Sequence, residues 1–280
     1  MAIKYLKPKV ISGKTVLLRV DVNEGVDLDG QLLDDFRIKA VLPTMELLLG
    51  DKNRLIVCGH LGRPKGEWEE SHSLRPVAKR LAELLNLKFV ETDKTLPDYP
   101  SVGHLIFYTG SILQDSAKKN LAKQSPKDIV VLENLRFYPG EEQNDAVLAK
   151  KLAALADVYV NDAFSVCHRA QASVVAVAKL LPKYAGLVIE REVKFLSAVL
   201  KNVKKPFVVL MGGIKISEKA ATIENLAKHA DQILLGGGLA NLFLEAQGLE
   251  IGHSKVERKE LKMANGLLKT LKHKLLLPVQ

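Results

Sequence analysis

The sequence predicts an α/β protein built on doubly wound parallel sheets. Short apolar segments alternate with amphipathic segments at least six times along the 280 residues. The short segments are apolar at nearly every position, which is typical of parallel strands whose sheet is covered by helices on both faces. In addition, glycines and polar or basic residues follow directly after most of these segments. Such strand ends form the ligand-binding edge of doubly wound folds.

The clearest of these strand ends lies in residues 56–66, IVCGHLGRPKG. The apolar start of this stretch predicts a buried strand. The loop that follows carries His60, Arg63 and Lys65 between three glycines. Cationic side chains and free backbone N–H groups at one edge of a sheet suit an anion, and phosphate most of all.

The composition is that of an ordinary globular protein, 47% hydrophobic and 26% charged. We find no apolar run long enough to span a membrane and no apolar signal segment at the N-terminus. The two cysteines, Cys58 and Cys167, offer no disulfide framework. We therefore expect a cytoplasmic protein.

The net charge of +9 favours anionic partners such as phosphorylated metabolites, nucleotides or nucleic acid. Aromatic residues make up only 5% of the chain, and no basic run is interleaved with them. A surface on which bases stack needs such aromatics. We therefore expect small anionic ligands, with neither a nucleic acid nor a membrane as partner.

The first part of the chain contains most of the predicted elements. Apolar runs predict strands at 15–20, 55–58, 88–90, 105–108, 128–133 and 158–160. Three- and four-residue apolar spacing predicts helices at 37–49, 74–85 and 146–156. Residues 96–127 are hard to assign and look like an insertion.

The second part begins after Pro182 with a long predicted helix over 185–200. Further strands are expected at 206–211 and 232–235, and one more begins at 275 and runs to the end of the chain. Helices are expected at about 218–229 and 257–273. The change of composition near Pro182 places a domain boundary there, which gives an N-terminal domain of residues 1–183 and a second part of residues 184–280.

The predicted strand ends place polar and charged residues and glycines along one edge of each sheet. They carry Asp21, Asn23, His60, Arg63, Arg136, Asn161, Asp162, Lys215, Lys219 and Gly236–Gly238. Guanidinium groups form paired hydrogen bonds with carboxylate and phosphate oxygens. Several arginines at equivalent positions therefore predict a clamp for a doubly anionic small molecule.

The stretch GGIKISEK, residues 212–219, predicts a second anion site. It lacks the spacing of a Walker A loop. It nevertheless places Lys215 and Lys219 four residues apart at the start of a helix, where an anion between them would relieve their repulsion. We find no nucleophilic triad, paired carboxylates or metal-ligand cluster. This absence fits phosphoryl transfer, in which positioning and charge neutralisation supply most of the rate enhancement.

The motifs together resemble the phosphoglycerate kinase family. The most specific are GHLGRPKG (59–66), ENLRF (133–137) and VNDAF followed by HRA (160–170). RVDVN (19–23), GGIKISEKAATIENL (212–226) and ILLGGGLANLFLEAQGLEIGHS (233–254) extend the resemblance in family order over nearly the whole chain. The resemblance implies a glycolytic kinase that transfers a phosphoryl group reversibly between 1,3-bisphosphoglycerate and ADP, giving 3-phosphoglycerate and ATP with Mg²⁺.

The resemblance also implies the architecture and the roles of residues. It implies a monomer with two doubly wound, Rossmann-like domains, the helix from about 185 acting as the hinge between them. The phosphoglycerate-binding residues would be Asp21, Val22, Asn23, Arg37, His60, Leu61, Gly62, Arg63, Arg136 and Arg169. Arg37 and Lys219 would act on the transferred group. Lys215 and Lys219 would contact nucleotide phosphates, and Gly236, Gly237 and Gly238 would form a wall of the adenine pocket.

The chain departs from the family pattern in four places. Val26 replaces a usual proline, and the residues near 96–127 look longer than the family norm. Ser165 and Val166 stand where the family usually has Gly-Thr. Members also continue beyond the point that matches residue 280, with an acidic magnesium contact and a glutamate for the ribose. We therefore expect a C-terminally truncated member whose second sheet is incomplete and exposes apolar surface, with Mg²⁺ held by the nucleotide phosphates alone. The alternative is a non-catalytic remnant that binds phosphoglycerate.

Overall fold

The computed structural model describes all residues except 1–2, 28, 97–102, 202, 272 and 279–280. The expected continuation of the last strand through 279–280 therefore lies outside the described residues. The chain divides into two compact units, Met1–Val193 (unit 1) and Lys194–Gln280 (unit 2). The boundary between them falls within the long helix α6, Leu187–Lys201.

Unit 1 contains a seven-stranded sheet with the order β3-β4-β5-β2-β1-β6-β7. All the neighbouring strands are parallel. The strands are β1 (Thr15–Arg19), β2 (Arg54–Cys58), β3 (Lys88–Thr92), β4 (His104–Tyr108), β5 (Ile129–Leu132), β6 (Val158–Asn161) and β7 (Lys183–Ala185). The chain places β2 to β5 on one side of β1 and β6 on the other, so the strand order reverses beside β1. Ligands of doubly wound folds bind at such a reversal.

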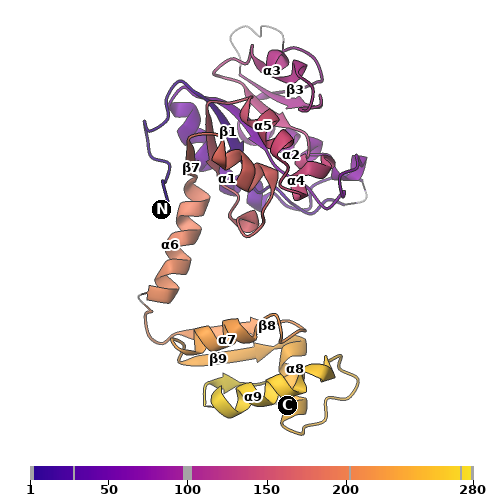
Figure 1. The fold of residues 1–280 in the computed structure, drawn as a ribbon, viewed down its shortest axis with the longest axis vertical. Coiled ribbons are helices and arrows are strands. Elements are labelled where there is room, and N and C mark those ends of the chain that lie inside the picture. The colour runs from indigo at the N-terminus through magenta and orange to yellow at the C-terminus, as the bar shows by residue number, and fades with distance from the viewer. Residues whose placement is uncertain (1–2, 28, 97–102, 202, 272, 279–280) are drawn as a thin grey trace. The chain divides into compact units, whose positions relative to one another are not determined.

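Helices cover both faces of this sheet, as the apolar strands predict (Figure 1). The helices α1 (Phe36–Gly50) and α2 (Arg75–Leu84) share one apolar cluster with alternate strand residues such as Leu18. The helices α3 (Ser116–Leu121) and α5 (Ala146–Ala153) share a second cluster with the intervening residues, such as Leu17. The prediction of a doubly wound sheet is thereby confirmed for unit 1.

Part of the stretch 96–127, which looks like an insertion in the sequence, belongs to this sheet. It supplies β4, which lies between β3 and β5 and is buried at all five positions, and also α3. The strand 105–108 was predicted correctly within it, but the stretch as a whole was misread because its remaining residues show no clear periodicity. Residues 97–102 lie outside the described part of the chain.

The edge of the sheet beyond β6 was not predicted. It is formed by β7, which has only three residues and is too short to give a sequence signal. The N-terminal segment runs beside it, with a parallel bridge between Tyr5 and Ala185. The backbone N–H of Leu6 donates to the carbonyl of Ala185 at 2.8 Å, and that of Ala185 donates to the carbonyl of Lys4 at 2.8 Å.

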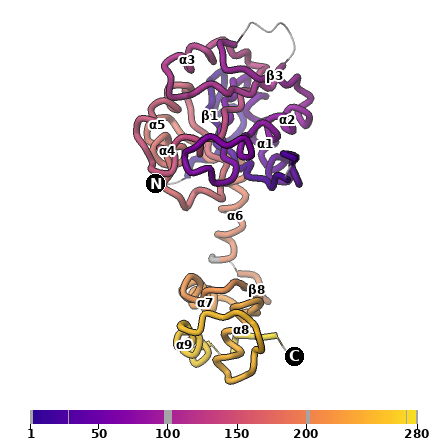
Figure 2. The backbone as a smooth tube through the Cα atoms, turned by 90° about the vertical axis from the view of Figure 1, so that its right-hand side faces the viewer, coloured from indigo at the N-terminus to yellow at the C-terminus, as the bar shows by residue number. Residues whose placement is uncertain are grey.

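Unit 2 contains a three-stranded parallel sheet with the order β10-β9-β8. Its backbone is drawn in orange and yellow in Figure 2. The strands are β8 (Val208–Gly212), β9 (Gln232–Gly236) and β10 (Leu275–Leu276), and the helices are α7 (Ala220–Ala227), α8 (Gly237–Ala246) and α9 (Leu261–Leu271). Helix α8 was missed because the glycines at its start indicate a loop. Apart from these differences and shifts of a few residues at element ends, the predicted elements are observed.

The sheet of unit 2 is covered on one face. Residues Ile233 and Leu235 are buried in one apolar cluster with α7, α8 and α9. The alternate positions of β8 point away from this cluster, and Leu210 is 78% exposed. The prediction that the second sheet is incomplete and exposes apolar surface is therefore confirmed.

Candidate functional site

Most of the predicted strand-end residues of unit 1 line one open cleft of about 220 Å³, but Asn161 and Asp162 do not. The cleft lies at the carboxyl ends of β1, β2, β5 and β6, beside the reversal of strand order. The lining residues are Asp21, Asn23, Arg37, His60, Gly62, Arg63, Arg136, Ser165, Val166 and Arg169. Four are arginines and one is a carboxylate, so the cleft favours an anion.

Four residues need separate mention. Val22 and Leu61, which the family resemblance assigned to the site, do not line the cleft. Their side chains are 2% and 3% exposed and belong to the apolar core of unit 1. In contrast, Ser165 and Val166 do line it. Their position between the end of β6 and the basic residues near 169 was the sequence signal that could have identified them.

Arg37 is held in place at the start of α1. Its Nη1 donates to Oδ2 of Asp21 at 2.6 Å. Its backbone N–H donates to Oε1 of Glu24 at 2.5 Å, and the backbone N–H of Ile38 donates to the same oxygen at 3.3 Å. Glu24 therefore caps the first turn of the helix, and burial is the main cause that raises the pKa of its carboxyl. Sequence reasoning missed Glu24 because a single acid before a helix gives no specific signal.

The loops after β1, β2 and β5 are tied together at Gly62. Its backbone N–H donates to Oδ1 of Asn23 at 2.8 Å, and its carbonyl accepts from Nη1 of Arg136 at 2.6 Å. Gly62 has a φ of +61°, and an added Cβ would lie 1.9 Å from the ring of His72. Only glycine fits this turn, so the close approach of the three loops depends on it.

Arg136 is the least exposed of the cleft arginines, with a side chain that is 5% exposed. Its Nε is buried and has no hydrogen-bond partner among the described residues. The carboxylate of Glu142 lies 3.7 Å away, which is beyond hydrogen-bonding distance. Burial lowers the pKa of Arg136, although a guanidinium stays charged in proteins. A buried, charged donor without a partner points to an anionic ligand.

His60 is a second buried polar residue of the cleft wall and is 3% exposed. Burial and then the positive charge of Arg19, followed by those of Arg136, Arg169 and Arg37, lower its pKa to about 2. The imidazole is therefore neutral at physiological pH. Its Nδ1 lies 2.9 Å from Nη2 of Arg19, a fully buried residue at the end of β1.

Unit 2 brings most of its predicted nucleotide residues together around the loop after β8. The carbonyl of Gly213 accepts from the backbone N–H of Leu239 at 2.7 Å, which joins this loop to the start of α8. Gly213 has a φ of +140°, and an added Cβ would lie 2.5 Å from Cε of Lys219. An added Cβ on Gly238 would lie 3.2 Å from the carbonyl oxygen of Gly213. Gly236 and Gly237 complete the connection from β9 to α8.

The two lysines of this loop differ in their surroundings. The side chain of Lys215 is 54% exposed, with its Nζ 3.8 Å from Oε1 of Glu218. Lys219 is half-buried and directly precedes α7. Because the glycines leave room beside these cations, the loop suits the phosphates of a nucleotide.

Glu260 holds this loop from a distant part of the chain. Its carboxylate accepts from Oγ of Ser217 at 2.5 Å and from the backbone N–H of Ile216 at 2.7 Å. The hydrogen bond from Ser217 is the main cause that lowers the pKa of Glu260. This contact could not be predicted from the sequence because the partners lie more than forty residues apart.

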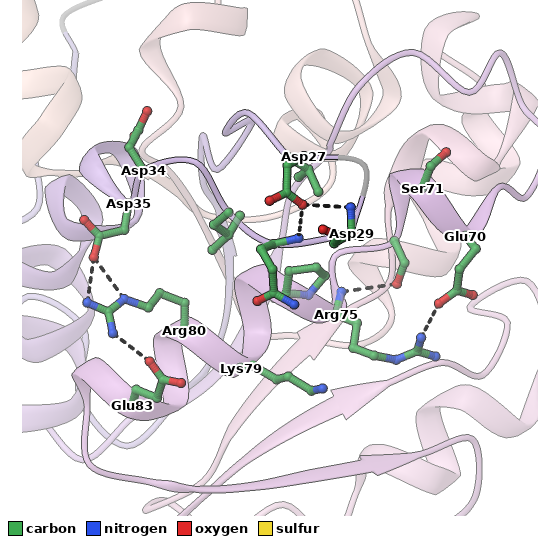
Figure 3. A pocket seen from close by; sticks show the side chains of 16 residues that line it. Asp27, Asp29, Asp34, Asp35, Glu70, Ser71, Arg75, Lys79, Arg80 and Glu83 are labelled. Atoms are coloured by element: carbon green, nitrogen blue, oxygen red, sulfur yellow. Dashed lines mark hydrogen bonds and ion pairs between the residues drawn. The ribbon is translucent and has the colours of Figure 1, made fainter.

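A larger hollow of about 800 Å³ lies elsewhere in unit 1, between residues 26–35 and α2. Figure 3 shows that its arginines are already paired. Arg80 bonds Asp35 at 2.8 Å and Glu83 at 2.6 Å, and Arg75 bonds Glu70. With these cations neutralised by neighbouring carboxylates, the hollow lacks the excess positive charge of the arginine-lined cleft.

Two absences concern the described residues. No group of three or more His, Cys, Asp or Glu side chains that could hold a metal ion occurs in the part of the chain that the structure describes. Within the same residues, no helix has the length and apolar character needed to cross a membrane.

Known proteins match nearly the whole chain. The family model described as "PGK: Phosphoglycerate kinase" matches residues 6–280. The phosphoglycerate kinase of Thermomicrobium roseum is 46% identical over 258 residues, which are 92% of this chain and 61% of the relative. That of Pelotomaculum thermopropionicum is 41% identical over 282 residues, which are 100% of this chain and 67% of the relative. "Phosphoglycerate kinase 3, cytosolic" of Arabidopsis thaliana is 43% identical over 277 residues, 98% of this chain and 65% of that protein.

Solved structures match the fold as well. Phosphoglycerate kinase from Coxiella burnetii superposes with a TM-score of 0.73 at 36% identity, over 96% of this chain and 64% of the other. The enzyme from Pyrococcus horikoshii OT3 gives a TM-score of 0.78 at 29% identity, over 96% and 65%. The chain thus spans between 61% and 67% of the length of the relatives that it matches. On the family model, the relatives and the shared fold, this chain belongs to the phosphoglycerate kinase family.

Proposed function

We propose that the arginine-lined cleft binds phosphoglycerates and that the chain carries out the reversible transfer of a phosphoryl group between 1,3-bisphosphoglycerate and ADP. The observation that carries this proposal is Arg136, a buried guanidinium whose Nε lacks a hydrogen-bond partner within the described chain. It stands in a cleft with three further arginines and a single carboxylate. Such a cleft matches a small molecule that bears both a phosphate and a carboxylate.

In this proposal the charged side chains of the cleft hold the phosphoglycerate. Arg63, Arg136 and Arg169 supply guanidinium forks, and Asn23 and His60 supply neutral polar groups. Asp21 orients Arg37, which also steadies the transferred group. Val22, Leu61 and Gly62 contribute backbone groups and the shape of the loops, since the side chains of Val22 and Leu61 are buried in the core.

The nucleotide is assigned to the loop after β8 and the start of α8. Lys215 and Lys219 contact the phosphates, and Lys219 also contacts the group in transfer. Gly236, Gly237 and Gly238 leave space for the adenine. Bound Mg²⁺ would neutralise phosphate charge, and in this proposal the phosphates of ATP or ADP supply its ligands. Because the transfer requires two substrates in line, we assign the role of hinge to α6.

The test uses the whole chain with 3-phosphoglycerate, ATP and Mg²⁺ in a coupled assay, beside calorimetric binding of 3-phosphoglycerate. We expect Lys219→Ala to reduce turnover by at least about a hundredfold and to leave 3-phosphoglycerate affinity within about twofold. Lys228→Ala is the matched control, since Lys228 is an exposed lysine at the other end of α7 whose Nζ donates to Asn225. Equal losses of turnover and affinity for Lys219→Ala, or no 3-phosphoglycerate binding by the unmodified chain, would contradict the proposal.

A second candidate is a phosphoglycerate-binding protein without turnover. The observation in its favour is that the sheet of unit 2 is covered on one face only, with Leu210 78% exposed. The same pair of measurements separates the two candidates. Binding of 3-phosphoglycerate without any turnover that responds to Lys219→Ala would favour this second candidate.

A further inference from the structure

A buried polar network lies behind the cleft. Nε of Arg19 donates to Oγ of Ser173 at 3.0 Å, and this hydroxyl donates to Oε1 of Glu141 at 2.5 Å. The backbone N–H of Ser173 donates to Oε2 of Glu141 at 2.9 Å. Arg19, Ser173 and Glu141 are each fully buried. The carboxylate thus balances the charge of Arg19 through one hydroxyl, and the guanidinium is held rigidly.

The network reaches the cleft through His60. Nη2 of Arg19 lies 2.9 Å from Nδ1 of His60. A guanidinium has donors only, so Nδ1 must be the acceptor of this hydrogen bond. In a neutral imidazole the proton is then on Nε2. Within the described residues, no hydrogen bond involves Nε2, and His60 lines the cleft.

The charges around His60 keep the ring neutral. The groups that act on it are Arg19 from β1, Arg136 after β5, Arg169 after β6 and Arg37 from α1, and all four are positive. A positive charge on the ring would be repelled by each of these arginines, and burial disfavours such a charge further. A neutral ring with a fixed proton can donate a hydrogen bond, but it cannot exchange protons with a substrate near neutral pH.

The geometry points to Arg19 as a positioning residue that fixes His60 in the Nε2–H tautomer, so that the imidazole presents a neutral hydrogen-bond donor to an anionic oxygen in the cleft. The identity of that oxygen, a phosphoglycerate carboxylate or phosphate, rests on the proposed function. The tautomer itself does not, because it follows from the contacts of Arg19. The cleft thereby gains a donor whose strength does not change with pH.

The first test is ¹⁵N NMR of the whole chain with labelled histidine. We expect His60 to show an unprotonated Nδ1 and a protonated Nε2, unchanged from about pH 5 to about pH 8. His72 is the internal reference, since its Nδ1 lies 2.7 Å from Oε2 of Glu69 and must therefore carry a proton. A His60 spectrum with the proton on Nδ1, or a ring that titrates in this range, would overturn the inference.

The second test is a double-mutant cycle on 3-phosphoglycerate affinity. We expect Arg19→Lys to weaken binding about tenfold in the unmodified chain and less than about twofold in a His60→Leu background, because the effect passes through the imidazole. Arg54→Lys is the control, since Arg54 is the first residue of β2, and the cleft lies at the carboxyl end of that strand. An equal loss in both backgrounds would show that Arg19 acts independently of His60 and would refute the assignment.

The two tests separate the inference from the proposed function. If Arg19→Lys does not fold, the spectrum of the unmodified chain still decides the tautomer. A spectrum with the Nε2–H form in a chain that does not bind 3-phosphoglycerate would support the role of Arg19 and reject the proposed ligand. A chain that binds 3-phosphoglycerate while His60 carries its proton on Nδ1 would support the proposed ligand and reject the role of Arg19.

Discussion

Unit 1 places its candidate residues on a sheet that helices cover on both faces, whereas unit 2 places them on a sheet covered on one face. In unit 1, Arg136 and His60 are nearly fully buried, and Arg19, the partner of His60, is fully buried as well. In unit 2, the side chain of Lys215 is 54% exposed. The cleft of unit 1 is therefore organised for an anion before any ligand arrives, which lowers the ordering cost of binding.

The comparison shows two ways of shaping a loop at a strand end. In unit 1 the loops are fixed by side chains that reach into the core, such as Arg19 and Glu141. In unit 2 the loop after β8 is fixed by one backbone hydrogen bond, from Leu239 to Gly213, and by the carboxylate of Glu260, which accepts directly from Ile216 and Ser217 in the loop. Buried polar networks stabilise a loop strongly but fail completely when one member is lost. The following predictions test this contrast.

The largest effect is expected for Glu141→Ala. This change removes the only carboxylate in the buried network that we describe and leaves the charge of Arg19 unbalanced in the interior, so unit 1 should lose about 4 kcal/mol of unfolding free energy. Denaturant unfolding followed by the fluorescence of Trp68, the single tryptophan of the chain, reports on unit 1. Glu142→Ala is the matched control, since its side chain is 52% exposed, and should cost less than about 0.5 kcal/mol. Similar losses for the two variants would refute the role of the network.

The next prediction compares the loss of stability caused by substitutions on the two faces of the sheet in unit 2. Ile233 is fully buried against the helices, and Ile233→Ala should cost about 3 kcal/mol through lost burial and a cavity. Leu210→Ala, on the uncovered face, should change the stability by less than about 0.5 kcal/mol. Unfolding followed by circular dichroism measures both. If Leu210→Ala costs as much as Ile233→Ala, the face that carries Leu210 is covered in solution.

A smaller effect is expected for the cleft arginines. Arg136→Ala should weaken 3-phosphoglycerate binding by about 2.5 kcal/mol, because this guanidinium is buried and already held by Gly62. Arg63→Ala should weaken it by about 1.5 kcal/mol, because Arg63 is exposed and its contact is screened by water. Calorimetry on the two variants gives the comparison. A larger loss for Arg63 would contradict the importance that we attach to burial.

The smallest effect concerns two aspartates whose pKa values move in opposite directions. Burial raises the pKa of Asp162 in unit 1, so the folded state binds more protons than the unfolded state just above pH 4, and the contribution of this carboxyl to stability falls as the pH rises. Its Oδ1 accepts from the backbone N–H of Val188 at 2.8 Å, and an asparagine keeps this acceptor. Asp162→Asn should therefore stabilise unit 1 at pH 7 by less than about 1 kcal/mol, with the difference shrinking towards pH 4.

The pKa of Asp231 in unit 2 is shifted in the opposite direction, so its replacement should change the stability with the opposite sign. A hydrogen bond from Lys205 is the main cause that lowers its pKa, so its contribution is present at neutral pH and is lost as the pH falls through the lowered value. Asp231→Asn should therefore destabilise unit 2 at pH 7. Unfolding of both variants across this pH range checks the signs. A loss of stability at pH 7 for Asp162→Asn would contradict the role of burial.

The sequence allowed much of this arrangement to be predicted because topology determines where strands end. Once the strands around Leu17 and Ile56 were recognised, the rule for parallel sheets placed Asp21, His60 and their neighbours at one edge. The structure brings eight of the ten expected phosphoglycerate residues into one cleft. Their roles remain proposals. The strand ends alone predicted that Asp21, Asn23, His60, Arg63 and Arg136 lie together, whereas Arg37, Gly62 and Arg169 were expected from the family resemblance.

The contacts behind the cleft were beyond such reasoning. Arg19 looked like part of an apolar strand, and its link to Ser173 spans 154 residues. Glu260 likewise reaches Ile216 across the chain. Buried hydrogen bonds of this kind depend on packing in three dimensions, whereas periodicity reports only on local structure. Helix α8 was missed for a related reason, because glycine at a helix start is compatible with a turn as well.

The pairing of the N-terminal segment with β7 also affects the order in which unit 1 folds during its synthesis. Tyr5 and Ala185 are neighbours in the sheet although nearly the whole of unit 1 separates them in the chain. During synthesis, the start of the chain must therefore wait for its partner until residue 185 has left the ribosome. Contacts between such distant residues slow folding, and domains form as they emerge from the ribosome. The last edge of the sheet is thus expected to close late, just as the first residues of α6 appear.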